Sequence, residues 1–232
     1  MAFQRRRLSP EDRRAELLAL GAEVFGQRPY DNVRIDEIAA LAGVSRALMY
    51  HYFPDKRAFF AAVVRAESDR MFEATNASAD GEGSLFDRVR AGVLAYLRYD
   101  QDHRHGAWAA HMGVGRTDPV LRGIEDVATD RQAQRIMSAI ESACESACES
   151  ASGAAWDVDA RRLMRATVYS WLAFTFEFCR QRILDQSLNA EAVADVCAHA
   201  LLDALVRTPG LPPELLDVAA DRPNVVPAWH DG

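Results

Sequence analysis

Apolar residues recur along most of the chain at intervals of three and four, which is the spacing of one buried face of an α-helix. No segment shows the alternating β-branched residues between turn signals that predict a strand. The pattern therefore predicts an all-α fold. The expected helices lie at about residues 10–27, 56–77, 85–100, 104–114, 119–151, 158–183 and 190–208, with two shorter helices within residues 35–56.

Turn-forming residues mark two of the boundaries between these helices. The polar, glycine-rich stretch at residues 76–84 separates the first four helices from the rest of the chain. Farther along, Asp118 can cap a following helix and Pro119 suits its first turn. The long helix expected from residue 119 thus has a clear start signal.

Two short helices that cross at a tight turn are predicted between Ile35 and Lys56, in the sequence IDEIAALAGVSRALMYHYFPDK. Ala39 lets the second helix come close, and Gly43 supplies the turn. The apolar residues that hold the pair together are Ile38, Val44, Met49 and Tyr52. This arrangement is a helix-turn-helix.

The second helix of the pair starts at Ser45, whose hydroxyl can cap the first amides. With Met49 and Tyr52 facing the core, the opposite face presents polar, aromatic and small side chains. They are Ser45, Arg46, Ala47, Tyr50 and His51. Side chains of these kinds suit contacts with base edges and phosphates.

The segments LLALGAEVFGQRPYDNV and IDEIAALAGVSRALMYHYFPDKRAFFAAVV follow one another between Leu17 and Val64, with GVS, Tyr-His-Tyr-Phe and Lys56 in that order. This block resembles the DNA-binding domain of the tetracycline-repressor (TetR) family of bacterial transcription regulators. The resemblance implies an N-terminal three-helix DNA-binding domain followed by a larger helical domain for ligand binding and dimerisation. It also implies that Lys56, at the start of the fourth helix, holds a DNA phosphate together with the helix N-terminus.

Two positions depart from the usual pattern of that family. Arg34 stands where many members have threonine or serine; it cannot accept a hydrogen bond from a helix amide, so Asp36 or water would do so, while its guanidinium can reach a phosphate. Leu48 stands where many have threonine and can contact only a thymine methyl. The candidate DNA-binding residues are Arg34, Ser45, Arg46, Ala47, Tyr50, His51, Tyr52 and Lys56.

Charge is divided unevenly along the chain. The net charge of the 232 residues is −7, of which residues 1–65 carry +3 and the remainder −10. Positive charge therefore accompanies the predicted DNA-binding segment, and the acidic remainder would avoid nucleic acid. Two alternatives stay open for Arg5, Arg6 and Arg7: a flexible arm that enters a neighbouring minor groove, or a disordered terminus.

These observations predict three parts of the chain: a helix-turn-helix DNA-binding domain at residues 1–65, an effector-binding and dimerisation domain at residues 66–208, and a C-terminal tail at residues 209–232. The tail holds five prolines and is expected to be loosely ordered. The alternative is that its apolar residues fold back onto the body, namely Val225, Val226 and Trp229.

The last two long helices are rich in apolar and small residues. The first carries Val168, Trp171, Leu172, Thr175, Phe176, Cys179 and Ile183, and the second carries Val193, Val196, Cys197, Ala200, Leu201, Ala204 and Leu205. These faces exceed what one bundle needs, which predicts a homodimer joined by a four-helix interface, as the resemblance also implies. The alternative is that a single chain buries them entirely.

Aromatic and apolar residues with a few polar tips suggest a ligand pocket in the larger domain. The candidate pocket residues are Tyr96, Trp108, His111, Met112, Tyr169, Trp171, Phe174 and Phe178. As a group they favour a small hydrophobic or amphipathic effector. The alternative is that they only fill the core.

Metal-ligating side chains do not form a convincing site. His103 and His105 lie two residues apart and do not share a helix face, so together with His111 they do not predict a metal site. The repeat ESACESACES places Cys144 above Cys148 on one helix, where a thiol pair could bind a soft metal or be oxidised. A duplication tolerated in a solvated helix is the simpler interpretation. We expect no metal and no cofactor.

No apolar run reaches the length of a membrane span, and no hydrophobic run follows the basic N-terminus, so we expect a cytoplasmic protein with reduced cysteines. The sequence has no glycine-rich phosphate loop, nucleophile elbow or HExxH motif, so we expect no enzyme. The expected function is a homodimeric transcription regulator, a repressor released from a palindromic operator by a small effector. The alternatives are a helical DNA-binding dimer without an effector and a protein-interaction module.

Overall fold

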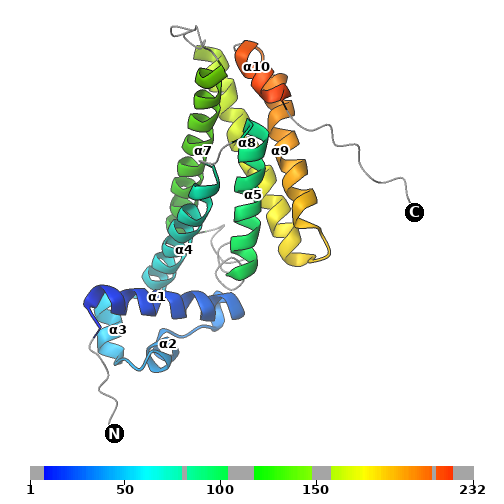
Figure 1. Cartoon of the computed structure of the whole chain (residues 1–232). Coiled ribbons are helices and arrows are strands. Elements are labelled where there is room, and N and C mark those ends of the chain that lie inside the picture. The colour runs from blue at the N-terminus through cyan, green and yellow to red at the C-terminus, as the bar shows by residue number, and fades with distance from the viewer. Residues whose placement is uncertain (1–7, 80–82, 104–117, 148–157, 211–212, 222–232) are drawn as a thin grey trace. The chain divides into compact units, whose positions relative to one another are not determined.

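The computed structural model describes residues 8–79, 83–103, 118–147, 158–210 and 213–221, and every regular element within them is a helix (Figure 1). The all-α prediction is confirmed. The elements are α1 (Pro10–Gln27), the 3-10 helix η1 (Tyr30–Asn32), α2 (Ile35–Leu41), α3 (Arg46–Tyr52), α4 (Lys56–Ala79), α5 (Leu85–Asp102), α7 (Pro119–Ala147), α8 (Val158–Leu184), α9 (Ala190–Val206) and α10 (Pro213–Ala220).

The chain divides into two compact units. Unit 1 comprises residues 1–73 and 99–128, and unit 2 comprises residues 74–98 and 129–232. Unit 1 therefore contains α1, α2 and α3 with the first part of α4, and unit 2 contains α8, α9 and α10. The domain limits expected at residues 65 and 208 stay predictions.

Unit 1 is built around an aromatic core. Phe59 and Phe60 of α4 are buried, and their ring centroids lie 5.8 Å and 4.6 Å from that of Phe25 in α1. Gly21 brings α1 close to α4, since a Cβ there would lie 2.5 Å from the Cζ atom of Phe59. Met49 of α3 is fully buried in the same core. The core therefore fixes α3 against α1 and α4.

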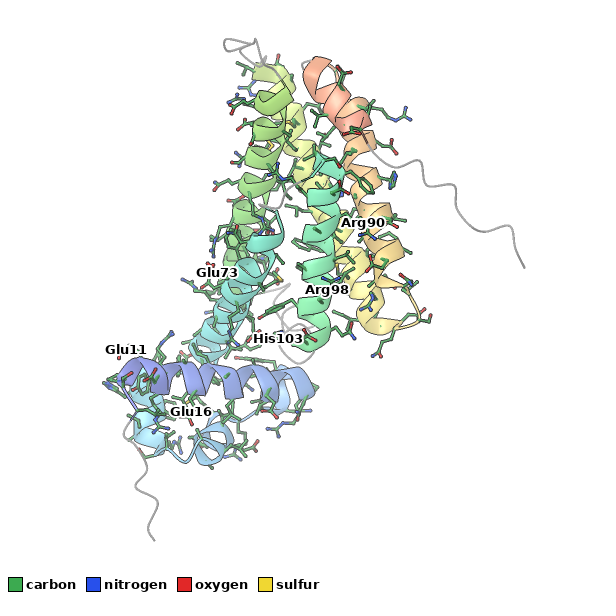
Figure 2. The ribbon with its side chains drawn as sticks, in the orientation of Figure 1. Glu11, Glu16, Glu73, Arg90, Arg98 and His103 are labelled. Carbon is green, nitrogen blue, oxygen red and sulfur yellow. The ribbon has the colours of Figure 1, made fainter. Side chains whose placement is uncertain are left out.

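In unit 2, α8 and α9 pack against each other as an antiparallel pair (Figure 1). The indole nitrogen of Trp171 in α8 donates a hydrogen bond to the backbone carbonyl of Cys197 in α9 at 2.7 Å. Helix α5 is tied to α9 by Arg90, labelled in Figure 2, whose guanidinium pairs with Glu191 and Asp195. Apolar packing and these polar contacts together position α5 beside the α8–α9 pair.

Most helix boundaries fall within two residues of the sequence pattern. Helix α5 continues to Asp102, and α9 ends at Val206. The start signal at Asp118 is confirmed, because its carboxylate accepts hydrogen bonds from the amides of Val120 and Leu121. The helix expected at residues 104–114 and the expected end of α7 beyond residue 147 lie outside the described residues.

The tail expected to be loosely ordered contains a helix, which corrects that prediction for part of its length. Helix α10 packs against α9 and begins at Pro213, where a missing amide hydrogen costs no helical hydrogen bond. Within it Ala219 is fully buried. The proposed fold-back of Val225, Val226 and Trp229 lies outside the described residues.

The apolar faces expected on α8 and α9 are largely buried within the single chain. On α8 the fully or nearly buried members are Val168, Trp171, Leu172, Thr175 and Cys179, and on α9 they are Val193, Cys197, Leu201 and Leu205. A second set of large apolar residues on the two helices stays exposed, namely Val158, Leu163, Phe174, Leu184, Val196 and Val206. Within the described part of the chain, no helix combines the length and apolar character needed to cross a membrane.

Candidate DNA-binding surface and effector cavity

The turn between α2 and α3 depends on two small residues. Gly43 has φ +64°, in the left-handed region that glycine adopts without strain. Ala39 is 2% exposed, and its carbonyl accepts a hydrogen bond from the amide of Val44 at 3.0 Å. The helix-turn-helix prediction is confirmed in its local geometry.

The two helices of this pair begin differently. The hydroxyl of Ser45 accepts a hydrogen bond from the amide of Leu48 at 3.1 Å, so the expected cap of α3 is confirmed. Arg34 stands at the corresponding position of α2 and provides no side-chain cap. Its guanidinium lies 3.9 Å from the carboxylate of Asp36, and 73% of its side chain is exposed. Arg34 is thus available to an anion from solvent.

The outward face of α3 combines a cation with an aromatic ring. The guanidinium of Arg46 lies 5.3 Å from the ring centroid of Tyr50, and its Nε atom lies 3.2 Å from Asp36. The side chains of Arg46 and Tyr50 are exposed, as are those of Ala47 and His51. The structure therefore brings the candidate residues of α3 onto one accessible surface.

Tyr52 and Lys56 lie at the edge of this surface and are half-buried. The ring of Tyr52 is 5.7 Å from that of His51, in an edge-to-face arrangement. The Nζ atom of Lys56 lies 4.2 Å from the ring centroid of Tyr30 and donates a hydrogen bond to the Asp31 carbonyl at 3.4 Å. The lysine ammonium is thus held in one orientation at the start of α4.

An ion pair within unit 1 joins the starts of α4 and α7. Arg57 donates two hydrogen bonds to the two carboxylate oxygens of Asp118, at 2.7 Å and 2.8 Å. These bonds, together with the amides of Val120 and Leu121, lower the pKa of Asp118 to about 2. The charged form of this carboxylate is therefore strongly favoured. Sequence analysis missed the pair because 61 residues separate its members.

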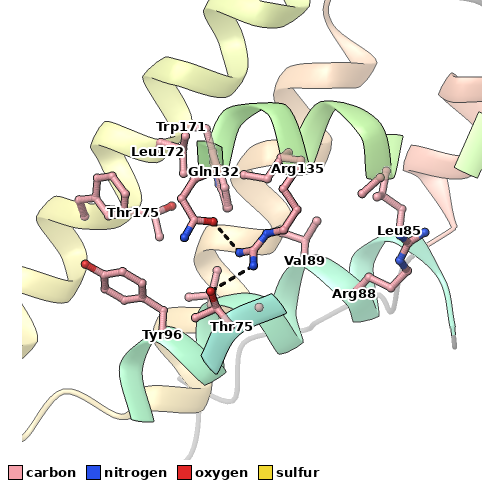
Figure 3. Close-up of a pocket in the computed structure, with 15 residues that line it drawn as sticks. Thr75, Leu85, Arg88, Val89, Tyr96, Gln132, Arg135, Trp171, Leu172 and Thr175 are labelled. Atoms are coloured by element: carbon pink, nitrogen blue, oxygen red, sulfur yellow. Dashed lines mark hydrogen bonds between the residues drawn. The ribbon is translucent and has the colours of Figure 1, made fainter. Parts of the chain in front are cut away.

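Unit 2 contains a cavity of about 640 Å³, including space open to solvent, between α4, α5, α7 and α8 (Figure 3). Its wall consists of Thr75, Leu85, Arg88, Val89, Gly92, Val93, Tyr96, Gln132, Arg135, Ile136, Ala139, Trp171, Leu172, Thr175 and Phe176. Most of these side chains are apolar. A cavity with apolar walls and a few oriented polar groups is typical of a small-molecule site.

Two of the eight predicted pocket residues, Tyr96 and Trp171, line this cavity. Tyr169, Phe174 and Phe178 do not. Tyr169 forms hydrogen bonds with Asp130 and Arg165, and the rings of Phe174 and Phe178 contact each other with centroids 5.1 Å apart. Phe174 precedes the buried Thr175 by one residue, so it points about 100° away around the helix. Trp108, His111 and Met112 lie outside the described residues.

Sequence analysis missed most of the cavity wall on α5, although a signal was present. The wall residues of α5 follow the three- and four-residue spacing of one helix face. They are Leu85, Arg88, Val89, Gly92, Val93 and Tyr96. The glycine in the middle of this stripe leaves space where other helices carry a side chain. Aromatic residues alone do not indicate this stripe, because its members include a glycine and an arginine.

The fold is that of an all-helical protein with a helix-turn-helix whose second helix, α3, presents an exposed face. The family model described as "Bacterial regulatory proteins, tetR family" matches residues 17–63, a segment that runs from within α1 into α4. Over this N-terminal segment the chain is similar to the tetR family of bacterial regulatory proteins.

Relatives of the chain are named regulators of transcription. The HTH-type transcriptional activator FasR of Mycolicibacterium smegmatis is 28% identical over 134 residues, which cover 58% of this chain and 61% of FasR, less than two thirds of its length. The HTH-type transcriptional repressor Rv1474c of Mycobacterium tuberculosis is 29% identical over 139 residues, covering 53% of this chain and 69% of the relative. A solved tetR-family regulator from Streptomyces coelicolor has the same fold, with a TM-score of 0.72 at 20% identity over 93% of this chain and 92% of that one.

Proposed function

We propose that this protein is a homodimeric regulator of transcription that binds a palindromic DNA site and, as a repressor, is released from it by a small apolar or amphipathic molecule. The observation that carries the proposal is the outward face of α3, where Arg46, Tyr50 and His51 are exposed beside the capping Ser45. A helix presented in this way reads the major groove of DNA. The names of FasR and Rv1474c support transcription regulation and include both an activator and a repressor.

A dimer is supported by the apolar side chains that α8 and α9 leave exposed. Leu163 and Phe174 lie eleven residues apart and so share one side of α8, and Val196 of α9 is 47% exposed. Such a patch is covered in most soluble proteins by another molecule. A second copy of the same helices would give a two-fold interface, and two recognition helices would then read paired half-sites.

Binding energy would come mainly from phosphate contacts by Lys56, Arg34 and the helix N-termini. The register on DNA and the sequence preference would come from Ser45, Arg46, Tyr50 and His51. Ala47 and Tyr52 would complete the surface. An effector in the cavity of unit 2 would favour a conformation in which the two recognition helices are wrongly spaced for the DNA site. The free energy of this shift cannot exceed the difference in the effector's binding free energy between that conformation and the DNA-binding one. A protein that binds DNA in this way would lie in the bacterial cytoplasm. Because the proposed residues bind DNA and an effector, we propose a regulator and not an enzyme.

The first experiment is selection of DNA by the purified full chain at physiological salt, from random or genomic fragments, followed by sequencing. We expect recovery of one palindromic sequence. Retention that is sensitive to salt but indifferent to sequence would contradict sequence-specific regulation.

Two substitutions separate sequence reading from phosphate binding. Arg46→Ala is expected to weaken the selected site by about 1 to 3 kcal/mol while leaving random DNA nearly unaffected. Lys56→Ala is expected to weaken all sequences alike and to reduce the salt dependence. Arg162→Ala, which removes an exposed arginine of α8, is the matched control and should change neither. Equal losses for Arg46→Ala on both DNAs would contradict base reading.

A rise in melting temperature with an added small molecule, matched by a fall in operator affinity, would support the effector part of the proposal. A molecule that binds in the cavity and leaves operator affinity unchanged would contradict it. A DNA-binding dimer that responds to no compound in such a screen would favour the alternative without an effector.

A further inference from the structure

One carboxylate of the helix-turn-helix contacts two arginines of the same unit. The Oδ1 atom of Asp36, in the first turn of α2, lies 3.2 Å from the Nε atom of Arg46, and its Oδ2 atom lies 3.9 Å from an Nη atom of Arg34. We propose, as an inference that rests on the proposed function, that Asp36 positions Arg46 to read a guanine in each half of the DNA site.

Asp36 does not act as the cap of α2 that its place in the sequence allowed. Among the described residues, its carboxylate pairs with the two arginines and caps no amide of that helix. Its Oδ1 atom is shielded from solvent and has no hydrogen-bond partner within the described chain. The positive charge of Arg46 is then the group that compensates this buried oxygen, which favours the observed place of the guanidinium.

The pairing occupies only one edge of the guanidinium of Arg46. Arginine has five N–H donors, and the Nε atom that faces Asp36 carries one of them. The two Nη atoms carry the other four, and guanine offers its O6 and N7 atoms to such a fork in the major groove. The ring of Tyr50, with its centroid 5.3 Å from the guanidinium, provides a second contact. An arginine held by two contacts loses less freedom on binding than one that is mobile in solvent.

Arg46 also occupies the end of α3 from which bases are read. It is the first residue of this helix, and the N-terminal residues of a recognition helix contact base edges. Its side chain is 70% exposed, whereas that of Asp36 is 32% exposed, so the arginine extends outward from the carboxylate. Since a carboxylate repels DNA phosphates, Asp36 weakens binding to every sequence. The gain that we expect from it is therefore discrimination between sequences.

The experiment uses the full-length protein and duplexes of the selected DNA sequence in which each guanine is replaced in turn by 7-deazaguanine. This base pairs normally with cytosine but lacks the N7 acceptor. We expect one guanine in each half-site whose replacement weakens binding by at least about fivefold, the lower end of what one bidentate pair contributes. Arg46→Lys keeps the charge but lacks the fork, so it should reduce this loss to less than about twofold.

Asp36→Asn removes the charge of the carboxylate with little change in side-chain shape. The loss caused by 7-deazaguanine should fall to less than about twofold, and affinity for random DNA should rise because a negative charge near the phosphates is removed. Asp36→Ser, which also lacks the charge, takes its place if Asp36→Asn does not fold. A purely structural role of Asp36 would change the melting temperature and leave the effect of 7-deazaguanine as it was.

Glu37→Gln is the matched control. It removes an acidic charge from the same turn of α2, but the partner of Glu37 is Arg28, whose Nη2 atom lies 2.8 Å from its carboxylate. This variant should show the same loss on 7-deazaguanine replacement as the unaltered protein.

The outcomes separate the role of Asp36 from the proposed function. A selected site with no guanine sensitive to 7-deazaguanine, or one whose sensitivity survives Arg46→Lys, would overturn guanine reading by Arg46 while sequence-specific binding stands. Full sensitivity in Asp36→Asn would overturn positioning by Asp36 and leave guanine reading intact. Retention of all DNA sequences alike would overturn the proposed function and this inference together.

Discussion

The helix-turn-helix of unit 1 and the cavity of unit 2 are specified over very different distances along the chain. The helix-turn-helix lies within Ile35–Tyr52, where the turn at Gly43 and the cap at Ser45 act on near neighbours. The cavity is assembled from four helices, with Thr75 on α4 and Phe176 on α8 at its two ends in sequence. The exposed surface of a helix-turn-helix can thus be specified by nearby residues, whereas a cavity requires helices distant in the sequence to pack together.

The two regions also differ in how tightly they are packed. At Gly21 in unit 1, a Cβ would lie 2.5 Å from Phe59 and 2.7 Å from Val63. At Gly92 in unit 2, a Cβ would meet nothing within 4 Å. The same residue type therefore permits close contact between helices in one region and preserves empty space in the other.

The largest expected effect comes from the core beneath the recognition helix. Met49→Ala should destabilise unit 1 by about 2 to 5 kcal/mol, because a fully buried side chain would be replaced by a cavity. The matched substitution in unit 2 is Met164→Ala, also at a fully buried methionine. Hydrogen exchange should show increased opening in the unit that is altered, and DNA affinity should fall more for Met49→Ala. Equal loss of DNA affinity would break the distinction between the regions.

Replacing a glycine by alanine should change the free energy of unfolding in opposite directions in the two regions. Gly21→Ala should cost about 1 to 3 kcal/mol by overpacking α1 against α4. Gly92→Ala should stabilise α5 by about 0.5 to 1 kcal/mol, since alanine is the better helix former and nothing obstructs its methyl group. Urea denaturation of the two variants provides the comparison. Stabilisation by Gly21→Ala would show that α1 and α4 can separate without cost.

The cap of α3 tests how far local chemistry alone holds the recognition helix. Ser45→Ala should cost about 1 kcal/mol, because the amide of Leu48 loses its acceptor. Ser45→Asn keeps a capping side chain and should restore most of that loss. Thermal unfolding without DNA measures both, so that any contact of Ser45 with DNA does not contribute. An unchanged melting temperature for Ser45→Ala would indicate that packing of Met49 is sufficient.

Asp118 combines a local cap with the distant Arg57 pair and gives the smallest expected effect. Asn in its place still caps α7 but removes the charge. The pKa of Asp118 is about 2, below the ordinary 3.8, because Arg57 stabilises the charged form. The extra stability is therefore fully present above about pH 4 and is lost as pH falls through 2. The difference in melting temperature between the native chain and Asp118→Asn should shrink over this interval; a difference constant with pH would contradict the pairing.

Local signals allowed much of unit 1 to be predicted. Gly43, Ser45 and the start of α7 at Asp118 and Pro119 were recognised because turns and caps depend on residues a few positions apart. Helix α10 is not predicted by such signals, because the prolines of the tail indicate a break in the chain, although the first helical position tolerates one.

The cavity was predicted only in part, and the residues explain why. Tyr96 and Trp171 were recognised from their size, but Phe174 is as large and is 39% exposed. Whether an aromatic side chain faces a cavity, the core or solvent depends on its angle around the helix and on the neighbour at that angle. The sequence alone does not reveal which residue of another helix is that neighbour.

By itself the sequence determined the described helices other than α10, the helix-turn-helix and the residues that its outer face presents, because hydrophobic period, glycine conformation and capping act within a few residues. Only the tertiary structure decided that Arg135, Thr75 and Gln132 meet, that Arg57 pairs with Asp118 and that the space beside Gly92 stays open. Those features depend on which helix faces lie together, and the packing of helices distant in the chain sets that arrangement.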